Sequence, residues 1–589
     1  MKHLERRAYL YQIALVACFL LLAGRLGLVQ VVQGARWASI SEGNSIRILP
    51  IVAPRGTMFD REGEPLASSR PAYHVSLLPM DRKPADATLT LLGELLGMTL
   101  AEVKREIAES KSLPYEPIRV KTDISPQEHT RIEERRAELP GVIVEVGPIR
   151  QYLYDTLASH VLGHIGKVDN RGRYGLEVMY DQYLTGENGG RQIEVDSRHR
   201  PTGRVLPKVD AVPGNNLVLT LDLSLQRVAE EALGQAMQAV RERPTKPYPN
   251  AKSGAVVALH IPTGEVLVMA SVPAFDPNLF AVGDRRVREL ELDPLKPFLN
   301  RAIKGLYQPG STFKMVTAVA GLAEQKVTLA ERVFCSGVYT LVPKKCWEPH
   351  GWVDFHTAIA VSCNTYFFEL GYRVSADPLA VYARGLGLGA KTGIDLPGEE
   401  AGIVPDVDWK RRNVPRDPQW WLAETLDAAI GQGFHIYTPL QLASYTATLA
   451  SGVQMQPHLV KRVISPRGEI LLEIEPQELG RPAISQAVLA EVKQGMRAVT
   501  APGGTAAWRF WDFPIAVAGK TGTAQNSHGD NHGLFVAYAP VDAPEIAVAV
   551  VVEQGGSGSA AGAPVAWAIF AQYFGLRKIS PPVPTAPAD

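Results

Sequence analysis

One apolar stretch near the start of the chain, Tyr9 to Val32, most constrains how the chain can fold. A helix of this length spans about 30 Å of hydrocarbon with some tilt, and Arg25, which interrupts it near its outer end, can reach the interface. Lys2, Arg6 and Arg7 precede it, so the positive-inside rule places residues 1–8 in the cytoplasm. A cleaved signal peptide is the alternative. Because no small-x-small cleavage site follows cleanly, we expect a retained anchor with the rest of the chain outside.

The remaining chain is long enough for at least two domains. With 589 residues, 46% hydrophobic residues and a formal net charge of zero, it can bury more than one core but offers no overall basic field for nucleic acid. Residues 33–212 alternate short β-like runs with polar turns and are expected to form a first extracytoplasmic domain, with a second over residues 213–577. The proline-rich end, residues 578–589, predicts a disordered tail.

Two segments of the first domain have the charged amphipathic pattern of helices: Asp86 to Ser112 and Pro126 to Leu139. We interpret residues 80–145 as an inserted head that contacts partners. An ordinary solvated face would produce the same charged pattern, and the sequence favours neither interpretation.

The second domain contains the motif Ser311-Thr-Phe-Lys314. A serine hydroxyl is a weak nucleophile at neutral pH and needs a base within hydrogen-bond reach. Ser311 suits a helix start after Pro309-Gly310, and the apolar run Met315 to Leu322 continues a helix, so Lys314 would share a face with Ser311. A lysine is a base only when neutral, which burial and a second cation favour by lowering its pKa. Alone this match is weak, because an ordinary helix start produces it by chance.

Two further motifs supply the second cation and the substrate-binding groups that the first motif lacks. Ser362-Cys-Asn364 offers a hydroxyl that could relay a proton to a leaving group and an amide that could bind a peptide group. Lys520-Thr521-Gly522-Thr523 follows a β-prone stretch, as an active-site edge strand requires, and Lys520 is the expected second cation. Thr521 and Thr523 would then donate to a substrate carboxylate. The backbone N–H groups of Ser311 and Thr523 would form an oxyanion hole.

The chain contains a second Lys-Thr-Gly sequence, Lys391-Thr392-Gly393. It lies in a glycine-rich segment that is typical of a loop between helices, and no β-prone stretch precedes it. We therefore assign the catalytic role to Lys520 and treat Lys391 as structural.

The second domain is predicted to be α+β. A strand is expected at Leu217 to Leu221 and a helix at Leu223 to Val240. Ser253 to His260 and Glu265 to Ala270 flank a Pro-Thr-Gly turn and predict a hairpin of a central antiparallel sheet. Leu534 to Tyr538 and Ile546 to Glu553 predict further strands after the Lys520 strand.

Four residues between the first motif and the end of the second could hold a metal: Cys335, Cys346, His350 and Cys363. Three thiolates and an imidazole complete a tetrahedral zinc shell, and such soft ligands suit a closed structural site. His356 is the substitute if His350 points to solvent. The alternative is a Cys335–Cys346 disulfide, with Cys363 a buried thiol.

In the order and context of these motifs the chain resembles the class B penicillin-binding proteins, and among them the penicillin-binding protein 2 branch, the elongation-specific peptidoglycan D,D-transpeptidases. The likeness covers nearly the whole chain. Besides the three motifs it rests on Ala53 to Gly63, Gly175-Leu-Glu177 with Tyr180, Gly186 to Gly190, Phe275 to Asn278, Asn300 to Ala302, Gly431 to Gly433, Thr438 to Leu442 and Gly503 to Ala506. Gly533 departs from the family pattern of a larger residue after His532, so we assign no role to His532.

The resemblance implies a penicillin-recognising domain, an antiparallel sheet with helices on both faces, on an elongated pedestal or dimerisation-like domain over residues 33–212. It implies two-step acyl transfer in which Ser311 attacks the penultimate D-alanine of a peptidoglycan stem peptide. Lys314 and Ser362 would pass the proton to the departing D-alanine, and an amine of a neighbouring stem would then attack the acyl-enzyme. β-Lactams would acylate Ser311 as mimics, and the chemistry itself needs no cofactor.

The resemblance also implies partners: stem peptides on lipid-linked glycan strands, a SEDS-family glycan polymerase contacted through the anchor and pedestal, and other elongation-complex proteins. The protein would be a single-pass protein of the cytoplasmic membrane. The rival functions are a D,D-carboxypeptidase or β-lactamase, a non-catalytic β-lactam sensor, and a division-specific transpeptidase. The anchor, the long pedestal and the lack of an obvious deacylating Glu motif argue against a hydrolase. The short segment before the anchor argues against a sensor.

Overall fold

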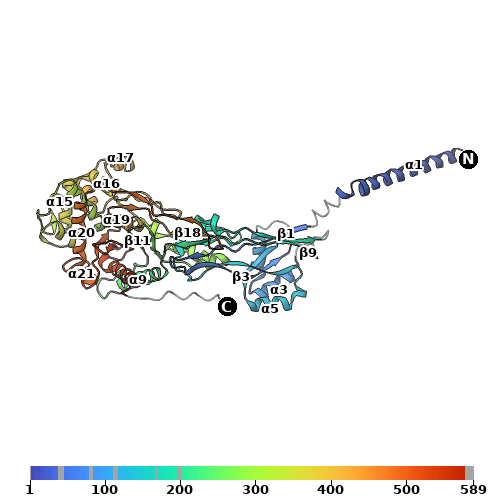
Figure 1. Ribbon diagram of the computed structural model, residues 1–589, viewed down its shortest axis with the longest axis horizontal. Helices are drawn as coiled ribbons and strands as arrows, with labels where there is room; N and C mark the ends of the chain where they lie inside the picture. The colour runs from blue at the N-terminus through green and yellow to red at the C-terminus, as the bar shows by residue number, and fades with distance from the viewer. Residues whose placement is uncertain are drawn as a thin grey trace. The chain divides into compact units, whose positions relative to one another are not determined.

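The computed structural model describes residues 2–36, 46–78, 84–110, 117–167, 169–195 and 201–576; the predicted tail over residues 578–589 lies outside them. The chain forms two compact units (Figure 1). The smaller unit comprises Met1–Pro54, Pro71–Pro148 and Gly186–Val212, and the larger comprises Arg55–Arg70, Ile149–Thr185 and Pro213–Asp589. The sequence analysis expected one boundary near residue 213. The units instead interleave along the chain, because two earlier segments pack with the later residues.

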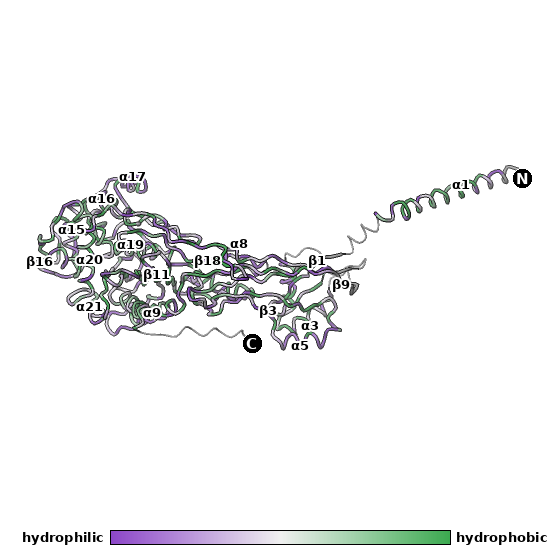
Figure 2. The backbone as a smooth tube through the Cα atoms, in the orientation of Figure 1, coloured by the Kyte–Doolittle hydropathy of each residue, from purple (hydrophilic) through white to green (hydrophobic). Residues whose placement is uncertain are grey.

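The N-terminal helix matches the predicted apolar segment. Helix α1 (Lys2–Gly27) continues into a π-helical turn, η1 (Leu28–Val32). Among the described residues, Tyr9–Val32 is the one helical segment long and apolar enough to cross a membrane. Its apolar side chains are exposed rather than packed in a protein core, and Figure 2 shows apolar residues along its length.

The smaller unit contains a sheet of β1 (Ile46–Ile51), β8 (Gly189–Val195) and β9 (Pro201–Val209), in the antiparallel order β1-β8-β9. Strand β4 (Ile118–Ile124) pairs with the later residues of β3 (Pro65–Leu77), and β5 (Val142–Tyr152) pairs with β3 as well. Apolar side chains of these strands and of three helices form a separate core, with Val75, Leu92 and Val103 fully buried.

The head predicted over residues 80–145 contains helices at both expected places, but the first is two helices, not one. Helix α3 (Asp86–Leu96) ends at Gly97, which adopts the left-handed conformation, and α4 (Leu100–Glu109) begins after a Thr99–Glu102 capping box. Helix α5 (Pro126–Glu134) begins with its own capping box and is followed by a 3₁₀ turn, Arg136–Glu138. The prediction of a single helix from Asp86 to Ser112 was wrong because periodicity does not register a one-residue left-handed stop.

The larger unit is built on a five-stranded antiparallel sheet in the order β12-β11-β23-β22-β21. Its strands are β11 (Gly254–His260), β12 (Val266–Val272), β21 (Ala518–Ala524), β22 (His532–Ala539) and β23 (Ile546–Val552). Helices pack on it in two groups, α9 (Leu223–Arg241) with α23 (Ala563–Tyr573), and α19 (Pro439–Ser451) with α20 (Gln486–Thr500). In Figure 1, α9 and the pair α19 and α20 lie on opposite sides of β11. The predicted hairpin and the edge position of the Lys520 strand are therefore confirmed.

A second sheet of this unit contains β10 (Asn216–Leu219), which ends two residues before the predicted Leu221. It pairs in parallel with β2 (Met58–Phe59) and antiparallel with β18 (Val460–Ile464). This pairing explains why Arg55–Arg70 packs with the larger unit.

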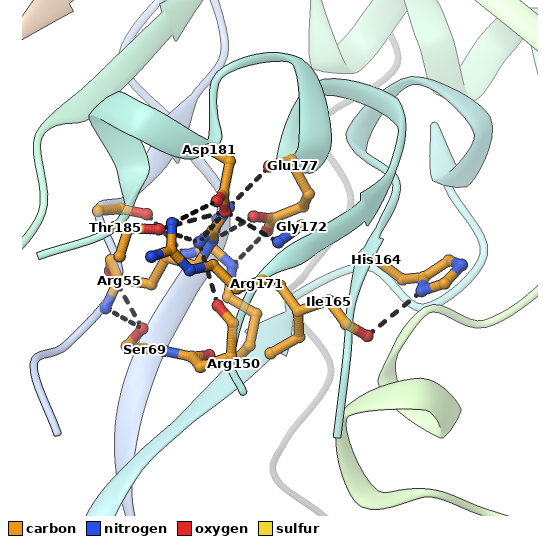
Figure 3. A network of polar contacts seen from close by, with 12 residues as sticks. Arg55, Ser69, Arg150, His164, Ile165, Arg171, Gly172, Glu177, Asp181 and Thr185 are labelled. Carbon is orange, nitrogen blue, oxygen red and sulfur yellow. Dashed lines mark hydrogen bonds and ion pairs between the residues drawn. The ribbon is translucent and has the colours of Figure 1, made fainter. Parts of the chain in front are cut away.

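Buried ion pairs connect two segments of the larger unit, Arg55–Arg70 and Ile149–Thr185 (Figure 3). Arg55 and Arg150 each donate to one oxygen of Glu177, and all three side chains are fully buried. Arg55 also pairs with Asp181 at 2.7 Å and donates to Thr185 Oγ1 at 2.7 Å. Burial alone would raise the pKa of Glu177, but the guanidiniums of Arg150 and Arg55 hold it below its ordinary value. The two guanidiniums therefore favour the ionised form of Glu177.

Candidate active site

Ser311 lies in a 3₁₀ turn, Gly310–Phe313, and helix α13 (Lys314–Ala323) begins only at the lysine. This differs from the α-helical start expected from sequence. In a 3₁₀ turn, residues three apart are eclipsed, so the tighter turn still places positions 311 and 314 on one face. Ser311 is partly exposed while Lys314 is fully buried. A partly exposed serine next to a desolvated lysine on the same face is the arrangement that a serine nucleophile and its base require.

The Lys314 amine points at the Ser362-Cys363-Asn364 loop. Its Nζ donates to Ser362 O at 2.8 Å, Ser362 Oγ at 3.2 Å and Asn364 Oδ1 at 2.7 Å. Burial lowers the pKa of Lys314 to about 8. About a tenth of the Lys314 amine is therefore neutral at pH 7.

Lys520, on the edge strand β21, reaches the same hydroxyl. Its Nζ donates to Ser362 Oγ at 2.9 Å and to Thr521 O at 2.9 Å. Burial, followed by repulsion from Lys314, holds the pKa of Lys520 well below its ordinary value. Ser362 itself adopts a left-handed backbone conformation, with φ of 55°. Strain of this kind costs about 1 kcal/mol or more and is common where a side chain must be aimed.

The turn before Ser311 lies directly against the end of β21. Gly310 has φ of +53°, and a Cβ built on it would meet Thr523 O at 2.5 Å. Its N–H donates to Gly431 O at 2.9 Å, and Gln432 Nε2 donates to Thr523 O at 3.2 Å. The close approach that only glycine permits brings the backbone of Ser311 beside that of Thr523, where an oxyanion hole is expected.

Thr505 joins two of the motifs. Its hydroxyl lies 2.8 Å from Thr521 Oγ1, and its N–H donates at 3.2 Å to Ala360 O, two residues before Ser362. The sequence analysis used Gly503 to Ala506 only as part of a resemblance and assigned Thr505 no role. No spacing rule identifies such a residue, because its partners Thr521 and Ala360 lie on other elements of the fold.

The larger unit contains a cavity of about 750 Å³. Because Gln432 both lines it and bonds Thr523, the cavity adjoins the strand that carries the third motif. It is lined by Leu306, Tyr307, Gln308, Asp427, Gln432, Gly433, Ile436, Gln525, Asn526, Ser527, Asn531 and His532.

The second Lys-Thr-Gly sequence lies in a loop closed on itself. Thr392 N and Oγ1 both donate to Glu399 Oε1 at 2.7 Å, and Gly393 N donates to Glu399 Oε2 at 3.1 Å. Lys391 is exposed and outside every strand. This geometry is consistent with a structural role.

Cys335, Cys346, His350 and Cys363 form one cluster, with their potential ligand atoms within 4.8 Å of one another. His350 Nδ1 lies 3.6 Å from Cys335 Sγ and 3.5 Å from Cys346 Sγ. The cysteines are free thiols. The neighbouring Cys363 thiol and backbone amides lower the pKa of Cys346. His356 lies apart, with its Nε2 2.9 Å from Glu491.

The cluster is joined to the catalytic loop. Asn364 N donates to Cys346 Sγ at 3.2 Å, and Cys363 is the middle residue of the second motif. The Cys363 side chain is completely buried while Ser362 and Asn364 contact Lys314.

Comparison with known proteins gives consistent matches along the chain. The family described as penicillin binding protein transpeptidase domain matches residues 254–574, and the penicillin-binding protein dimerisation domain matches residues 50–219. The peptidoglycan D,D-transpeptidase MrdA of Acinetobacter baumannii is 31% identical, over 98% of this chain and 89% of its own.

Two solved structures extend these matches to the fold. A complex of penicillin-binding protein PBP2 with MreC from Helicobacter pylori aligns with a TM-score of 0.75 at 26% identity, covering 90% of this chain and 99% of that chain. A peptidoglycan synthase complex that coordinates polymerization and crosslinking contains a chain with a TM-score of 0.71 and 31% identity, covering 97% and 99%.

Proposed function

Because the chain belongs to the class B penicillin-binding proteins and is a peptidoglycan D,D-transpeptidase of the elongation type, we propose that Ser311 is its nucleophile. Lys314, Ser362, Asn364 and Lys520 complete the catalytic group. The observation that carries this assignment is the convergence of Lys314 Nζ and Lys520 Nζ on Ser362 Oγ, at 3.2 and 2.9 Å. Two buried amines on one hydroxyl disfavour each other's charged form, which keeps a base available.

In the first half-reaction the Ser311 hydroxyl attacks the carbonyl carbon of the penultimate D-alanine, and Lys314 accepts its proton. The N–H groups of Ser311 and Thr523 stabilise the oxyanion. Ser362, hydrogen-bonded to Lys314, relays that proton to the nitrogen of the terminal D-alanine as the C–N bond breaks. The product is an ester between Ser311 Oγ and the stem peptide.

Recognition of the substrate's terminal carboxylate is assigned to Lys520, Thr521, Gly522 and Thr523 on β21. Thr521 and Thr523 donate hydroxyl hydrogens, and Lys520 supplies positive charge. Gly522 lets the strand pack closely behind Ser311, because an added Cβ would lie 3.0 Å from Pro309 O. Asn364 binds a peptide group through its side-chain amide, whose Oδ1 Lys314 orients at 2.7 Å.

Fluorescent-penicillin labelling followed by a chase tests this assignment. We expect a long-lived adduct on the unmodified protein and none on Ser311→Ala. Rapid loss of label would favour a D,D-carboxypeptidase or β-lactamase. Labelling of a folded Ser311→Ala variant would refute the nucleophile.

We further propose that Cys335, Cys346, His350 and Cys363 hold a structural Zn²⁺. Zinc–sulfur and zinc–nitrogen bonds of about 2.3 and 2.0–2.1 Å at a tetrahedral angle separate the ligand atoms by about 3.5 Å. The His350 Nδ1 to sulfur distances of 3.5 and 3.6 Å agree with that value. The ion would complete a closed shell and take no part in the chemistry. Through the Asn364 N–H to Cys346 Sγ hydrogen bond it would brace the catalytic loop.

Metal analysis of the purified protein tests the zinc site. We expect one zinc per chain, lost in Cys363→Ser and retained in Cys18→Ser, because Cys18 lies exposed on α1. Absence of zinc from the unmodified protein, together with a Cys335–Cys346 disulfide, would contradict the site.

The apolar segment Tyr9–Val32 supports a single membrane anchor with a cytoplasmic N-terminus and an extracytoplasmic catalytic domain. The solved relatives, one bound to MreC and one in a synthase complex, support elongation-complex partners. Among these we propose a SEDS-family glycan polymerase. Protease added outside spheroplasts should digest the catalytic domain, and its protection would contradict this orientation.

A further inference from the structure

The two ends of the catalytic cleft are chemically different. At the Thr523 end lies the cavity of about 750 Å³, with amide and hydroxyl side chains such as Gln525 and Asn526. Beside Thr521 and the Ser362 loop lie two exposed tryptophans: Trp508 is linked to Thr521 through Ser559 and Thr505, and Trp347 donates to Val361 O. Each has 57% of its surface exposed.

Both indoles are held in place by their ring nitrogens. Trp347 Nε1 donates to Val361 O at 3.1 Å, and Trp508 Nε1 donates to Ser559 Oγ at 2.9 Å. The hydrogen bonds satisfy the one polar atom of each ring, and the Trp347 ring also makes an edge contact with the His350 ring, yet more than half of each tryptophan stays exposed. Large fixed aromatic surfaces left exposed beside a catalytic site mark places where a ligand binds.

Short chains of contacts connect both tryptophans to the catalytic loop. Val361, the acceptor for Trp347, immediately precedes Ser362. On the other side, Ser559 Oγ donates to Thr505 O at 2.7 Å. Thr505 in turn contacts Ala360 O and Thr521 Oγ1.

The function proposed above determines which substrate binds at the end of the cleft beside Thr521. If the scissile carbonyl lies at Thr523 N and the terminal carboxylate at Thr521, the departing D-alanine occupies the Thr521 end. The acylated peptide then extends past Thr523 toward the cavity. The incoming amine must enter where the amine departed, because the groups that protonated the leaving nitrogen must also deprotonate the new one.

We propose that Trp347 and Trp508 bind the acceptor strand of peptidoglycan, their indole faces stacking on its sugar rings and adjoining stem. Pyranose rings present flat C–H faces that suit an aromatic surface. The acceptor amine then attacks the ester carbonyl of the Ser311 acyl-enzyme. A C–N bond forms, the C–Oγ bond breaks, and the amine proton passes through Ser362 and Lys314 to Ser311 Oγ.

The test measures transfer of the acyl group from the acyl-enzyme to two different acceptors, with the full-length protein in detergent. Soluble glycan fragments that carry stem tetrapeptides are the long acceptor, and a free D-amino acid is the short one. Trp508→Ala and Trp347→Ala should each lower kcat/KM for the glycan fragments about tenfold, the scale of one lost aromatic contact, relative to the D-amino acid. Trp508→Phe should recover most of the loss.

Two controls make the result interpretable. Trp352→Ala removes another exposed indole, which pairs with Phe334 across strands β13 (Val333–Cys335) and β16 (Gly351–Val353). This variant should leave kcat/KM unchanged for both acceptors. Fluorescent-penicillin labelling of every variant reports an intact cleft, and its loss in Ser311→Ala tests the proposed function separately. Unchanged transfer to glycan fragments, or an equal loss for both acceptors with labelling intact, would overturn the proposal.

Discussion

Lys520 Nζ lies 2.9 Å from Ser362 Oγ, although 158 positions separate the two residues. Lys314 Nζ reaches the same oxygen at 3.2 Å. Because both amines are fully buried, a second positive charge there is costly, and proton transfer between Lys314 and Ser362 becomes easy. The catalytic behaviour of the protein should follow from this shared hydroxyl.

Acylation should depend on pH through Lys314. Its pKa of about 8 is lower than the ordinary 10.5, because burial disfavours the charged amine. Since only the neutral amine accepts the Ser311 proton, the rate should fall about tenfold per pH unit below the pKa and level off above it. Stopped-flow measurement of acylation by a chromogenic β-lactam at a series of pH values gives this dependence of the rate on pH. Lys493→Met, which removes a half-buried lysine that bonds Ala450 O, should leave the profile unchanged. A flat profile would contradict the assignment.

Glu177→Gln should destabilise the larger unit by about 3–5 kcal/mol, because it removes the carboxylate that two buried guanidiniums share and leaves Arg55 to rely on its pair with Asp181. Arg55 and Arg150 both bond this carboxylate, and none of the three side chains is exposed. Denaturant unfolding, followed by tryptophan fluorescence, measures the loss. The exposed pair Arg135–Glu138 provides the control, and Glu138→Gln should not shift the transition. Equal unfolding curves for Glu177→Gln and the unmodified protein would refute the proposed role of the cluster.

Gly310→Ala should strongly reduce penicillin labelling. The new methyl would sit 2.5 Å from Thr523 O, and φ of +53° is unfavourable for alanine. Both effects push the Ser311 turn away from Thr523 and open the oxyanion hole. Gly234→Ala is the matched control because nothing lies within 4 Å of its added Cβ, in the middle of α9. That change should leave labelling intact and stabilise by up to about 1 kcal/mol. Normal labelling of Gly310→Ala would show that the turn adapts.

Thr505→Val should raise KM for D-Ala-D-Ala peptides more than it lowers kcat. The change removes the hydroxyl 2.8 Å from Thr521 Oγ1 while keeping the shape of the side chain, so Thr521 is less well oriented toward the substrate carboxylate. The loss of one such hydrogen bond is worth about 1 kcal/mol, or about fivefold. Thr505→Ser, which retains the hydroxyl, should restore KM. If the serine variant behaves like the valine variant, Thr505 acts through packing alone.

Much of this protein could be predicted where its features are local or repeat along the chain. Two β-prone runs around a Pro-Thr-Gly turn located the hairpin of β11 and β12, a β-prone apolar stretch located the edge strand that carries Lys520, and apolar length located Tyr9–Val32. The helix break at Gly97 escaped prediction because one left-handed residue leaves the surrounding periodicity unchanged. The 3₁₀ turn at Ser311 escaped it because both helix types place residues three apart on one face.

The sequence by itself determined the residue types, their order and their near-neighbour geometry: a serine and a lysine three apart, a loop with a serine and an asparagine, and a strand that carries Lys520. Only the tertiary structure decided that Lys520 meets Ser362, that Thr505 links Thr521 to Ala360, and that Arg55 and Arg150 share Glu177. The physical reason is that local patterns fix dihedral angles and faces. Contacts between different elements of the fold depend on how a whole buried core packs, and no short window of residues contains that information.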